Sequence, residues 1–522
     1  MRQHLHVRIF ALLVICFAIV PATIAAQVSP KNILLVLADD IGTDALSLWN
    51  TNAGAQLPPT PNINSLAQQG IIFRNAYAYP SCSPTRCSIL TGRYGFRTGI
   101  GGAIGDPGDP YLSPRDFTIA KALSANPQLG IRHAHVGKWH LSTNAIDPNF
   151  IGGWSHYSGF LAGERSSYYN WEKTVNGVTT VSTNYATSDN ATDAINWINA
   201  QGTNRWFLWF APKAAHAPFE RPPNNLHTYT QTTNDFQRYQ AMIQALDTEL
   251  GRVWTNINLA ETLVVFLGDN GTPTEVVQQP YDSFHCKGTL FEGGVRVPMF
   301  ITGAGVVSPG RTNASVVHAV DLPATMLELM GVNLATTLPT NLVFDSRSFA
   351  AVVRDEVWAP SENVILMENF GGVIPPQLEG VAARGQRYKV IKLDNGPQAF
   401  YDLQVDPYET DNLLGAPPNL NNLTTPQRNA YVGLTNRLGG WHNPPVAPTI
   451  TLLDGHLGTF ALTVPEQLGI TYELARATVV TATNWSVLTN YVRHVSTNSA
   501  QVMLTDLAPV GNGFYRVTAT GR

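Results

Sequence analysis

Charged side chains are scarce in this sequence of 522 residues, of which they make up 13%; globular proteins average about 25%. With 33 Lys and Arg against 37 Asp and Glu, the formal net charge is −4, and only eight of the basic residues are lysine. A protein that gathers nucleic acid or coats an anionic membrane needs a basic excess, so this balance excludes both classes. The apolar fraction of 44% is globular, which also excludes disordered and fibrous proteins.

Long hydrophobic runs are also lacking. The run Ile9–Val20 holds twelve apolar residues, fewer than the ~20 that span a bilayer, which disfavours the alternative of an uncleaved membrane anchor. The run follows a basic N-terminal segment and precedes small residues, an order typical of a secretory signal cleaved near Ala25 or Ala26. We therefore predict a signal peptide over residues 1–26, a periplasmic or secreted protein, and no stable membrane insertion.

Cysteine is rare, with Cys16, Cys82, Cys87 and Cys286 as the whole set. Cys16 leaves with the predicted signal peptide, so three cysteines remain. An odd number in an exported protein raises the question of whether one of them is reactive.

Short apolar runs alternate with helical stretches in the first two thirds of the chain. Asn32–Ala38 has the unbroken apolar pattern of a strand buried on both faces, and Trp206–Phe210, Thr262–Leu267 and Met299–Thr302 resemble it. Helices are predicted between Pro61 and Gly70, near Phe236–Ile257 and near Pro323–Met330. This alternation predicts an α/β domain over residues 27–362, with a mostly parallel sheet and a site at the carboxyl ends of its strands.

The pattern changes after residue 362. Four short strand-like stretches and a helix near Pro426–Leu438 predict an antiparallel subdomain over residues 363–442. A proline-rich joint, Asn443–Pro448, then begins the last segment. Its strand-like stretches predict a small β-sandwich-like module over residues 443–522.

Two pairs of oxygen-bearing side chains follow two of the predicted strands. Asp39 and Asp40 come directly after the first strand, and Asp269 and Asn270 follow the third across one glycine. Helix capping or turn formation explains either pair taken alone. Because the carboxyl ends of parallel strands share one edge of a sheet, the two pairs together favour a site for Ca²⁺ or Mg²⁺.

The densest cluster of chemically active residues runs from position 79 to position 93. Ser83 and Pro84 suit the N-cap and the first position of a helix, so Cys82 is predicted just before the helix begins. Free N–H groups and the helix dipole favour an anion there, and Arg86 can bind an anion bidentately one turn later. A buried structural cysteine is the alternative.

These residues resemble a known family. Cys82-Ser83-Pro84-Thr85-Arg86 with Thr91-Gly92 resembles the signature of the type I, formylglycine-dependent sulfatases, and Gly137-Lys138-Trp139-His140 is similar to the end of their second signature. Further matches in the family's order are His216-Ala217-Pro218, Asp269-Asn270-Gly271, Lys287 with Phe291–Pro298, Tyr401-Asp402-Leu403 and Asp411-Asn412-Leu413. The resemblance spans roughly residues 30–440 and implies the α/β fold of the alkaline phosphatase superfamily, with a central mostly parallel sheet and a smaller C-terminal antiparallel subdomain.

The resemblance implies that a maturation enzyme oxidises Cys82 to formylglycine (3-oxoalanine). The aldehyde hydrates to a gem-diol, which attacks the sulfur of an aryl or carbohydrate sulfate ester with one hydroxyl and expels sulfate with the other. A thiolate would instead be trapped as a thiosulfate-like adduct. The family also implies one divalent cation, Ca²⁺ rather than Mg²⁺, bound by Asp39, Asp40, residue 82, Asp269 and Asn270.

By the same resemblance, five further side chains have catalytic roles. Arg86 and Lys138 are expected to hold the hydrated aldehyde, and His140 to take the proton that drives sulfate release. Lys287 and His216 are expected to hold the sulfate and help the alcohol depart. The other histidines considered, which we take as structural, are His133, His135, His285 and His442.

Three questions stay open. A phosphonate or phosphate-ester hydrolase of the same superfamily and a non-catalytic carbohydrate-binding protein are the alternative functions. We hypothesise that Cys87 and Cys286 form a disulfide beside the site, because Cys87 follows Arg86, Cys286 precedes Lys287, and the protein is predicted to be exported. Substrate specificity is expected in the loops Gly99–Pro110 and Trp154–Thr174. The aromatic residues of the second loop suit either stacking on sugar rings or core packing.

Overall fold

The computed structural model describes residues 29–438, apart from 106–108, 110, 165–166, 341, 361–363 and 372–377, and the backbone of seven strands beyond residue 450. The predicted signal peptide, the proline-rich joint and His442 lie outside the described residues. Among the helices that are described, none combines the length and the apolar character needed to cross a membrane.

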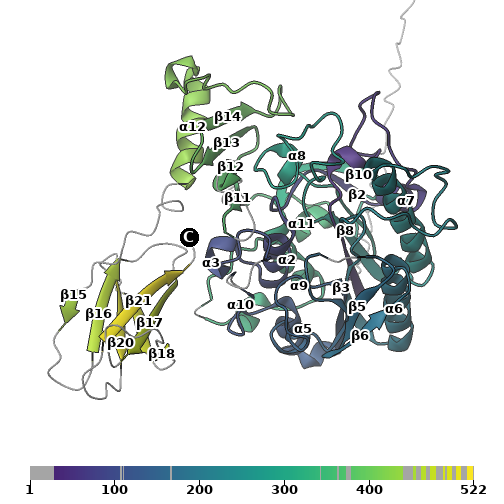
Figure 1. The fold of residues 1–522 in the computed structure, drawn as a ribbon, viewed down its shortest axis with the longest axis horizontal. Coiled ribbons are helices and arrows are strands. Elements are labelled where there is room, and N and C mark those ends of the chain that lie inside the picture. The colour runs from purple at the N-terminus through teal and green to yellow at the C-terminus, as the bar shows by residue number, and fades with distance from the viewer. Residues whose placement is uncertain are drawn as a thin grey trace, which may run out of the picture.

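A ten-stranded sheet runs through the larger part of the molecule, in the order β10-β2-β9-β8-β1-β7-β3-β4-β5-β6 (Figure 1). Its strands are β1 (Asn32–Ala38), β2 (Ile71–Tyr77), β3 (Ile131–Lys138), β4 (His156–Phe160), β5 (Trp171–Val175), β6 (Val178–Ser182), β7 (Arg205–Ala211), β8 (Thr262–Gly268), β9 (Met299–Gly303) and β10 (Arg311–His318). Strands β8, β1, β7, β3 and β4 are parallel neighbours, whereas β9 is antiparallel to both β8 and β2. The predicted mostly parallel sheet is confirmed, and β5 and β6 add an antiparallel hairpin at one edge.

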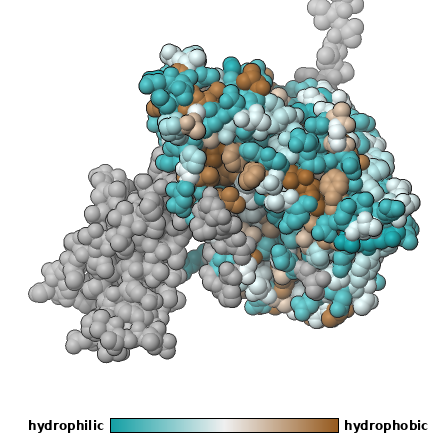
Figure 2. All heavy atoms as spheres, turned by 45° about the horizontal axis from the view of Figure 1, so that its top comes forward, coloured by the Kyte–Doolittle hydropathy of each residue, from teal (hydrophilic) through white to brown (hydrophobic). Residues whose placement is uncertain are grey.

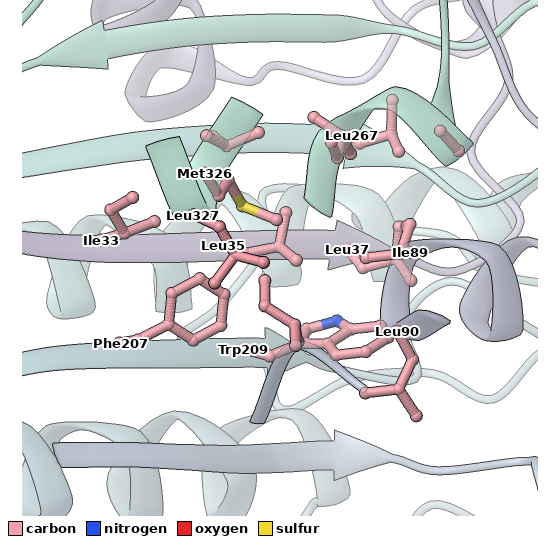
Figure 3. Close-up of a cluster of buried hydrophobic side chains, with 14 of the residues drawn as sticks. Ile33, Leu35, Leu37, Ile89, Leu90, Phe207, Trp209, Leu267, Met326 and Leu327 are labelled. Atoms are coloured by element: carbon pink, nitrogen blue, oxygen red, sulfur yellow. The ribbon is translucent and has the colours of Figure 1, made fainter. Parts of the chain in front are cut away.

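Twelve helices are described: α1 (Pro61–Gln68), α2 (Cys82–Thr91), α3 (Gly95–Thr98), α4 (Ile119–Ser124), α5 (Asp147–Phe150), α6 (Ala186–Gln201), α7 (Asp235–Trp254), α8 (Glu292–Val295), α9 (Leu322–Leu329), α10 (Leu334–Thr337), α11 (Ala350–Val353) and α12 (Thr425–Leu438). Helices α2, α4 and α9 cover one face of this sheet and α1, α6 and α7 cover the other, because alternate residues of each strand face opposite ways. Leu35 and Leu37 of β1 pack into one core with residues of α2, α4 and α9, as Figure 3 shows for α2 and α9. Leu34 and Val36 pack into the other core, with residues of α1, α6 and α7. Each such side chain contributes about 1.5–3 kcal/mol on burial, so the two cores fix the sheet from both sides.

A second, antiparallel sheet follows in the chain. It consists of β11 (Ile365–Asn369), β12 (Gly380–Arg384), β13 (Tyr388–Leu393) and β14 (Gln398–Asp402), with α12 packed against β12 and β13. Beyond residue 450, two smaller antiparallel sheets contain β15 (Thr451–Leu453), β16 (Phe460–Pro465), β17 (Thr471–Ala477), β18 (Ser486–Val487), β19 (Tyr491–Val495), β20 (Gln501–Asp506) and β21 (Phe514–Thr520). The strand content agrees with the predicted architecture, while the domain boundaries at residues 362 and 442 stay predictions.

The register of the parallel strands determines where functional side chains meet. Ala38 pairs with Gly268, Val36 with Phe210, and Gly137 with Ala211. The residues that follow β8, β1, β7 and β3 therefore emerge side by side at one edge of the sheet.

On the face of the molecule in Figure 2 the surface is mostly hydrophilic, with hydrophobic areas interspersed.

Candidate active site

The carboxyl ends of β1 and β8 place two carboxylates next to each other. Asp39 and Asp269 are the first residues beyond these strands, and both are fully buried. The Asp269 amide donates to the Ala38 carbonyl at 3.0 Å, and the Asp40 amide donates to Asp269 Oδ1 at 3.0 Å. Asp40 has a φ of 61°, a conformation that costs roughly 1–3 kcal/mol in a non-glycine residue and clusters at functional sites.

Helix α2 brings Cys82 to the same edge. The prediction that Cys82 precedes the helix was wrong, and the helix starts two residues earlier than expected, because Ser81 rather than Ser83 is the N-cap and Cys82 is the first helical residue. Ser81 makes no capping hydrogen bond with its side chain, and all ten residues of α2 are buried. Packing of the buried helix therefore determines where α2 begins, and the capping side chain that was expected at Ser83 does not. Cys82 lies in the first turn, where unpaired N–H groups and the positive end of the helix dipole favour an anion.

Arg86 joins three strand ends through its guanidinium. Nη1 donates to the Lys138 carbonyl at 2.9 Å, and Nη2 donates to Asp269 Oδ2 at 2.8 Å and lies 3.5 Å from Asp39 Oδ2. The side chain is fully buried, so these charge-assisted contacts hold it in one position.

Strand β3 and the residues after it supply Lys138 and His140. The Lys138 side chain is fully buried, with Nζ 2.7 Å from Asp39 Oδ2. His140 Nδ1 lies 3.1 Å from Cys82 Sγ, and Nε2 lies 2.7 Å from the Ile104 carbonyl. Because a carbonyl only accepts hydrogen bonds, Nε2 carries the ring proton and Nδ1 presents its lone pair to residue 82.

The turn after β7 carries His216. The Ala215 amide donates to the Asp39 carbonyl at 2.8 Å, which ties this turn to the end of β1. His216 Nε2 lies 3.7 Å from Asp40 Oδ2, and Nδ1 lies 2.8 Å from the Ala217 carbonyl. By the same reasoning as for His140, Nδ1 is the protonated nitrogen, and the lone pair of Nε2 is directed at the carboxylates.

Lys287 comes from the loop before α8. Its Nζ lies 2.6 Å from Asp40 Oδ1, and its side chain keeps 22% of its surface exposed, whereas Lys138 keeps none. The adjacent Gly288 is held on both sides: its amide donates to the Pro80 carbonyl at 2.8 Å, and its carbonyl accepts from Asn369 Nδ2 at 2.9 Å. Lys287 is therefore a fixed cation on the solvent side of the cluster.

Two buried oxygens at this edge accept no hydrogen bond from the described residues. They are Oδ1 of Asp39 and Oδ1 of Asn270, whose Nδ2 donates to Asp40 Oδ1 at 2.8 Å. Oδ2 of Asp39 has ion-pair contacts alone, with Lys138 and Arg86. Ligand atoms of Asp39, Asp40 and His216 also lie within 4.8 Å of one another. An unsatisfied buried oxygen costs about 1–3 kcal/mol, so this oxygen-rich group fits a hard divalent cation.

The fixed charges of the site balance before any ligand binds. Three carboxylates face three cationic side chains: Asp39, Asp40 and Asp269 against Arg86, Lys138 and Lys287. A buried dication would therefore need further negative charge from a ligand. The site suits a cation and an anion together better than either alone.

The pKa values of the three carboxyl groups move in different directions. Burial alone raises the pKa of Asp39, but Lys138 and the other nearby charges outweigh burial and lower it below its usual range. At Asp40 burial is likewise outweighed, chiefly by Lys287, and the pKa is lowered. At Asp269, burial and the neighbouring Asp39 charge raise the pKa.

Both histidines of the site are neutral at neutral pH. Burial and then the charge of Lys138 lower the pKa of His140 to about 3, and the same two causes lower the pKa of His216 to about 3. A neutral imidazole with a free lone pair can accept a proton, which is the state a general base requires.

The structure brings all of the predicted site residues to one edge of the sheet. They are Asp39, Asp40, Cys82, Arg86, Lys138, His140, His216, Asp269, Asn270 and Lys287. Two contributors had not been predicted. The Ile104 carbonyl fixes the His140 tautomer, and no sequence pattern marks a backbone carbonyl. Tyr168 donates through its hydroxyl to the His216 carbonyl at 2.7 Å; its place in the aromatic loop was the available signal.

The hypothesis of a Cys87–Cys286 disulfide was wrong. Both cysteines are buried and free. Cys87 packs in the core that includes α2, whereas Cys286 Sγ lies 3.2 Å from Thr274 Oγ1 in a separate loop. Sequence adjacency to Arg86 misled the prediction, because neighbouring residues of a helix project about 100° apart.

The aromatic residues of the 154–174 loop divide into two groups. Trp154, Tyr157, Tyr168 and Trp171 are at most 3% exposed, which resolves their role as core packing. Tyr169 is 38% exposed. The histidine His135, taken as structural, is indeed buried and stacks on Trp209 at 4.8 Å.

Known proteins match this chain over the region that contains the candidate site. Residues 31–332 match the model of the family described as Sulfatase, and residues 282–429 match the C-terminal region of N-sulphoglucosamine sulphohydrolase. The chain is 27% identical over 517 residues to a sulfatase of Formosa agariphila, which covers 80% of this chain and 90% of that protein. It is 28% identical over 468 residues to bovine arylsulfatase A, with 74% and 84% covered. The match to human N-acetylgalactosamine-6-sulfatase, 29% identical over 335 residues, covers 58% of this chain and 62% of that enzyme, less than two thirds of its length.

Solved structures show the same architecture. The crystal structure of Ps i-CgsB in complex with k-i-k-neocarrahexaose superposes with a TM-score of 0.67 at 23% identity, covering 79% of this chain and 92% of that chain. A protein in complex with its substrate D-glucosamine-2-N,6-O-disulfate superposes with a TM-score of 0.62 at 21% identity, covering 78% and 97%. At these identities the likeness establishes the fold, which agrees with the predicted alkaline-phosphatase-like architecture.

Proposed function

The chain belongs to the sulfatase family and is a sulfuric ester hydrolase, and from that premise we propose that it releases sulfate from carbohydrate or aryl sulfate esters through a formylglycine formed from Cys82. The observation that carries the proposal is the buried cluster around Cys82, in which unpaired oxygens and cationic side chains lie together. That combination suits a cation and a sulfate in direct contact.

The residues around position 82 fit a hydrated aldehyde better than a thiol. Hydration of the aldehyde would supply a hydroxyl nucleophile at this position. Arg86 and Lys138 lie close to Asp39 and contribute the positive charge that holds such a group. His140 presents the lone pair of Nδ1 to residue 82, so it takes the proton that accompanies sulfate release.

We further propose that the cation is Ca²⁺, bound by Asp39, Asp40, Asp269 and Asn270 together with residue 82. When bound, the cation would polarise a sulfate oxygen and favour the ionised nucleophile. Ca²⁺ accepts six to eight oxygen ligands in irregular geometry, as this mixed carboxylate and amide set offers, whereas Mg²⁺ demands near-octahedral ligands.

Lys287 and His216 are assigned to the sulfate and the leaving alcohol. Burial lowers the pKa of Lys287, but Asp40 outweighs burial and raises it, so the side chain stays charged and can hold a sulfate oxygen. His216 approaches the same region from the turn after β7, with Nε2 3.7 Å from Asp40 Oδ2. Its Nε2 accepts a hydrogen bond or a proton there, and the charged Lys287 can donate to the departing oxygen.

The remaining parts of the proposal concern maturation and location. A formylglycine-generating enzyme is the partner that modification of Cys82 requires. The run Ile9–Val20 supports export to the periplasm or the outside. We propose that residues 27–362 form the catalytic domain, residues 363–442 its C-terminal subdomain and residues 443–522 a separate β module. N-terminal sequencing of secreted protein checks the first boundary.

The proposal is tested by measuring sulfate release from an aryl sulfate and a panel of sulfated glycans, using protein matured with a formylglycine-generating enzyme. Cys82→Ala should lose activity to background. Cys87→Ala is the matched control, because Cys87 is a buried thiol on the same helix, and it should retain activity. Faster hydrolysis of the matched aryl phosphate would instead favour the phosphate-ester alternative, and activity that survives Cys82→Ala would overturn the assigned nucleophile.

A further inference from the structure

A pocket of about 590 Å³ lies beside the candidate active site. Its walls come from the segment after β3, from the end of β4 and from the β5–β6 hairpin, represented by Thr143, Phe160, Trp171 and Thr179. Strand β4 is parallel to β3, with Phe160 level with Lys138. The pocket therefore opens at the same edge of the sheet as the site. Its volume lies within the roughly 300–1,000 Å³ of small-molecule sites.

The segment from residue 161 to residue 164 separates the pocket from His140. The Leu161 carbonyl accepts the His140 amide at 2.9 Å, and Gly163 packs so closely that a Cβ there would lie 2.2 Å from His140 Nε2. Leu161, Ala162 and Glu164 line the pocket. One short segment thus contacts the proposed base and forms a wall of the pocket.

The lining of the pocket has a different chemistry from the site. The site holds three cationic side chains, whereas the described lining holds no Lys, Arg or His and includes the carboxylates of Glu164 and Glu172. These carboxylates repel an anionic group such as a second sulfate. Hydroxyl and amide groups of Thr143, Asn170 and Thr179 offer neutral hydrogen-bonding partners.

The pocket also has apolar surface among these polar groups. Among the lining residues, the side chains of Phe160 and Trp171 are 3% exposed and that of Val181 is 66% exposed. A lining that mixes apolar surface with several uncharged donors and acceptors complements a ligand with hydroxyls along its edge and C–H groups on its face. A sugar ring without sulfate has this character, whereas a flat aryl group leaves the polar groups unpaired.

We propose that this pocket binds an uncharged sugar unit next to the sulfated one, so that the substrate is a sulfated oligosaccharide with an unsulfated neighbour. The inference rests on the proposed function and specifies its substrate class. Sulfate goes to the cationic site, and the neutral unit goes to the pocket beyond the segment 161–164.

The test uses two tryptophan substitutions in β6. Thr179 lines the pocket, whereas Thr180 is the next residue of the strand and faces the other side of the sheet. Both positions are exposed on an edge strand, so both variants should fold. The substrates are an aryl sulfate, the sulfated monosaccharide that wild-type enzyme hydrolyses fastest, and the same monosaccharide extended by one or two unsulfated sugar units.

Wild type should show a lower KM for the extended substrate than for the monosaccharide. Thr179→Trp should raise that KM about tenfold or more, as expected when a ligand loses one well-fitted contact, and should leave aryl sulfate hydrolysis unchanged. Thr180→Trp should change neither. Titration of Cys82→Ala protein with the same sugars gives the comparison without turnover.

Three results would overturn the subsite. They are equal KM values of wild type for extended and unextended sugars, an equal effect of Thr179→Trp on all substrates, and equal effects of the two tryptophans. Absence of sulfate release from every substrate is a different failure, because it contradicts the proposed function. The titration then still decides whether the extended sugar binds more tightly.

Discussion

Two buried clusters of charged side chains in this molecule have opposite designs. In the site, Lys138 Nζ lies 2.7 Å from Asp39 Oδ2, whereas Oδ1 of Asp39 and Oδ1 of Asn270 are buried and accept no hydrogen bond from the described residues. In the second cluster, Lys389 of β13 lies 3.0 Å from Glu292 and 2.9 Å from Glu409, and Tyr77 donates to the other Glu292 oxygen at 3.0 Å. Each carboxylate oxygen of Glu292 and Glu409 has a protein partner, with Lys389 as the ion-pair partner of Glu409 Oε1, whereas the site leaves two buried oxygens for a ligand.

The partners of each cluster indicate its role. Buried ion pairs contribute little net stability when complete, but removal of one partner is costly. The second cluster, formed by Glu292, Lys389 and Glu409, joins the antiparallel sheet to α8, which follows the loop that carries Lys287. It therefore holds the loop of Lys287 in place, whereas the charges around Asp39 are those that the proposed function assigns to the substrate.

The largest expected effect is on activity, from Lys138→Met. The substitution removes a cation from the proposed nucleophile and should lower kcat about 10²–10³-fold, as loss of one electrostatic contact in a transition state does. Asp39 keeps its contact with Arg86, so the melting temperature should change little. Steady-state kinetics and thermal unfolding measure the two quantities. A large loss of stability with normal kcat would contradict the open design of the site.

For Lys389→Met we expect a large loss of stability and little change in kcat. Two carboxylates then stay buried without their ammonium, which should lower the free energy of unfolding by about 3–5 kcal/mol. The kcat of the folded protein should stay within a fewfold of wild type. Lys392→Met is the control, because Lys392 is exposed on the same strand, and it should leave both quantities unchanged. Denaturant unfolding measures the change in stability. A Lys389→Met variant that stays stable but loses activity would contradict the structural role assigned to the second cluster.

Calcium should show a smaller difference between the two clusters, measured as a change in the free energy of unfolding. At about 100 times its Kd, a ligand that binds only the folded state raises the free energy of unfolding by about 2.7 kcal/mol. Wild type should show this rise, and a chelator should remove it. Asp39→Asn should abolish the response, whereas Glu292→Gln should retain it. A calcium response that survives Asp39→Asn would place the cation elsewhere.

The last expected effect is a pH dependence of stability. Burial, opposed by Lys389 and reinforced by Glu292, raises the pKa of Glu409 from 4.5 to about 7. The folded state then binds the proton more tightly than the unfolded state, so this group's contribution is fully present below pH 4.5 and is lost as pH rises through about 7. Unfolding measured from pH 4.5 to 8 should show less decline for Glu409→Gln than for wild type. An identical decline would remove Glu409 as its source.

Much of the site could be predicted because its residues follow buried apolar strands. The runs at Asn32–Ala38 and Thr262–Leu267 identified two strand ends, and the polar residues after them form part of the candidate site. The start of α2 was misplaced by two residues, since packing rather than a capping side chain positions it. The run at Met299–Thr302 identified β9 but not its antiparallel direction, because an apolar run does not encode strand direction.

What the sequence could not provide are contacts between distant segments. Glu292, Lys389 and Glu409 lie far apart in the chain, and each resembles an ordinary surface residue in its local context. The pocket beside His140 likewise forms only when the β5–β6 hairpin packs beside β4. Such features depend on the folded chain rather than on any local pattern.

The most direct test of the central claim is the mass of the peptide that contains residue 82. Trypsin cleaves after Arg74 and Arg86 and releases Asn75–Arg86, which holds one cysteine. In active protein this peptide should have the mass of the formylglycine form, without sulfur, and its abundance should rise in proportion to sulfate release across preparations. Full activity in protein whose peptide keeps the unmodified cysteine mass would contradict the account.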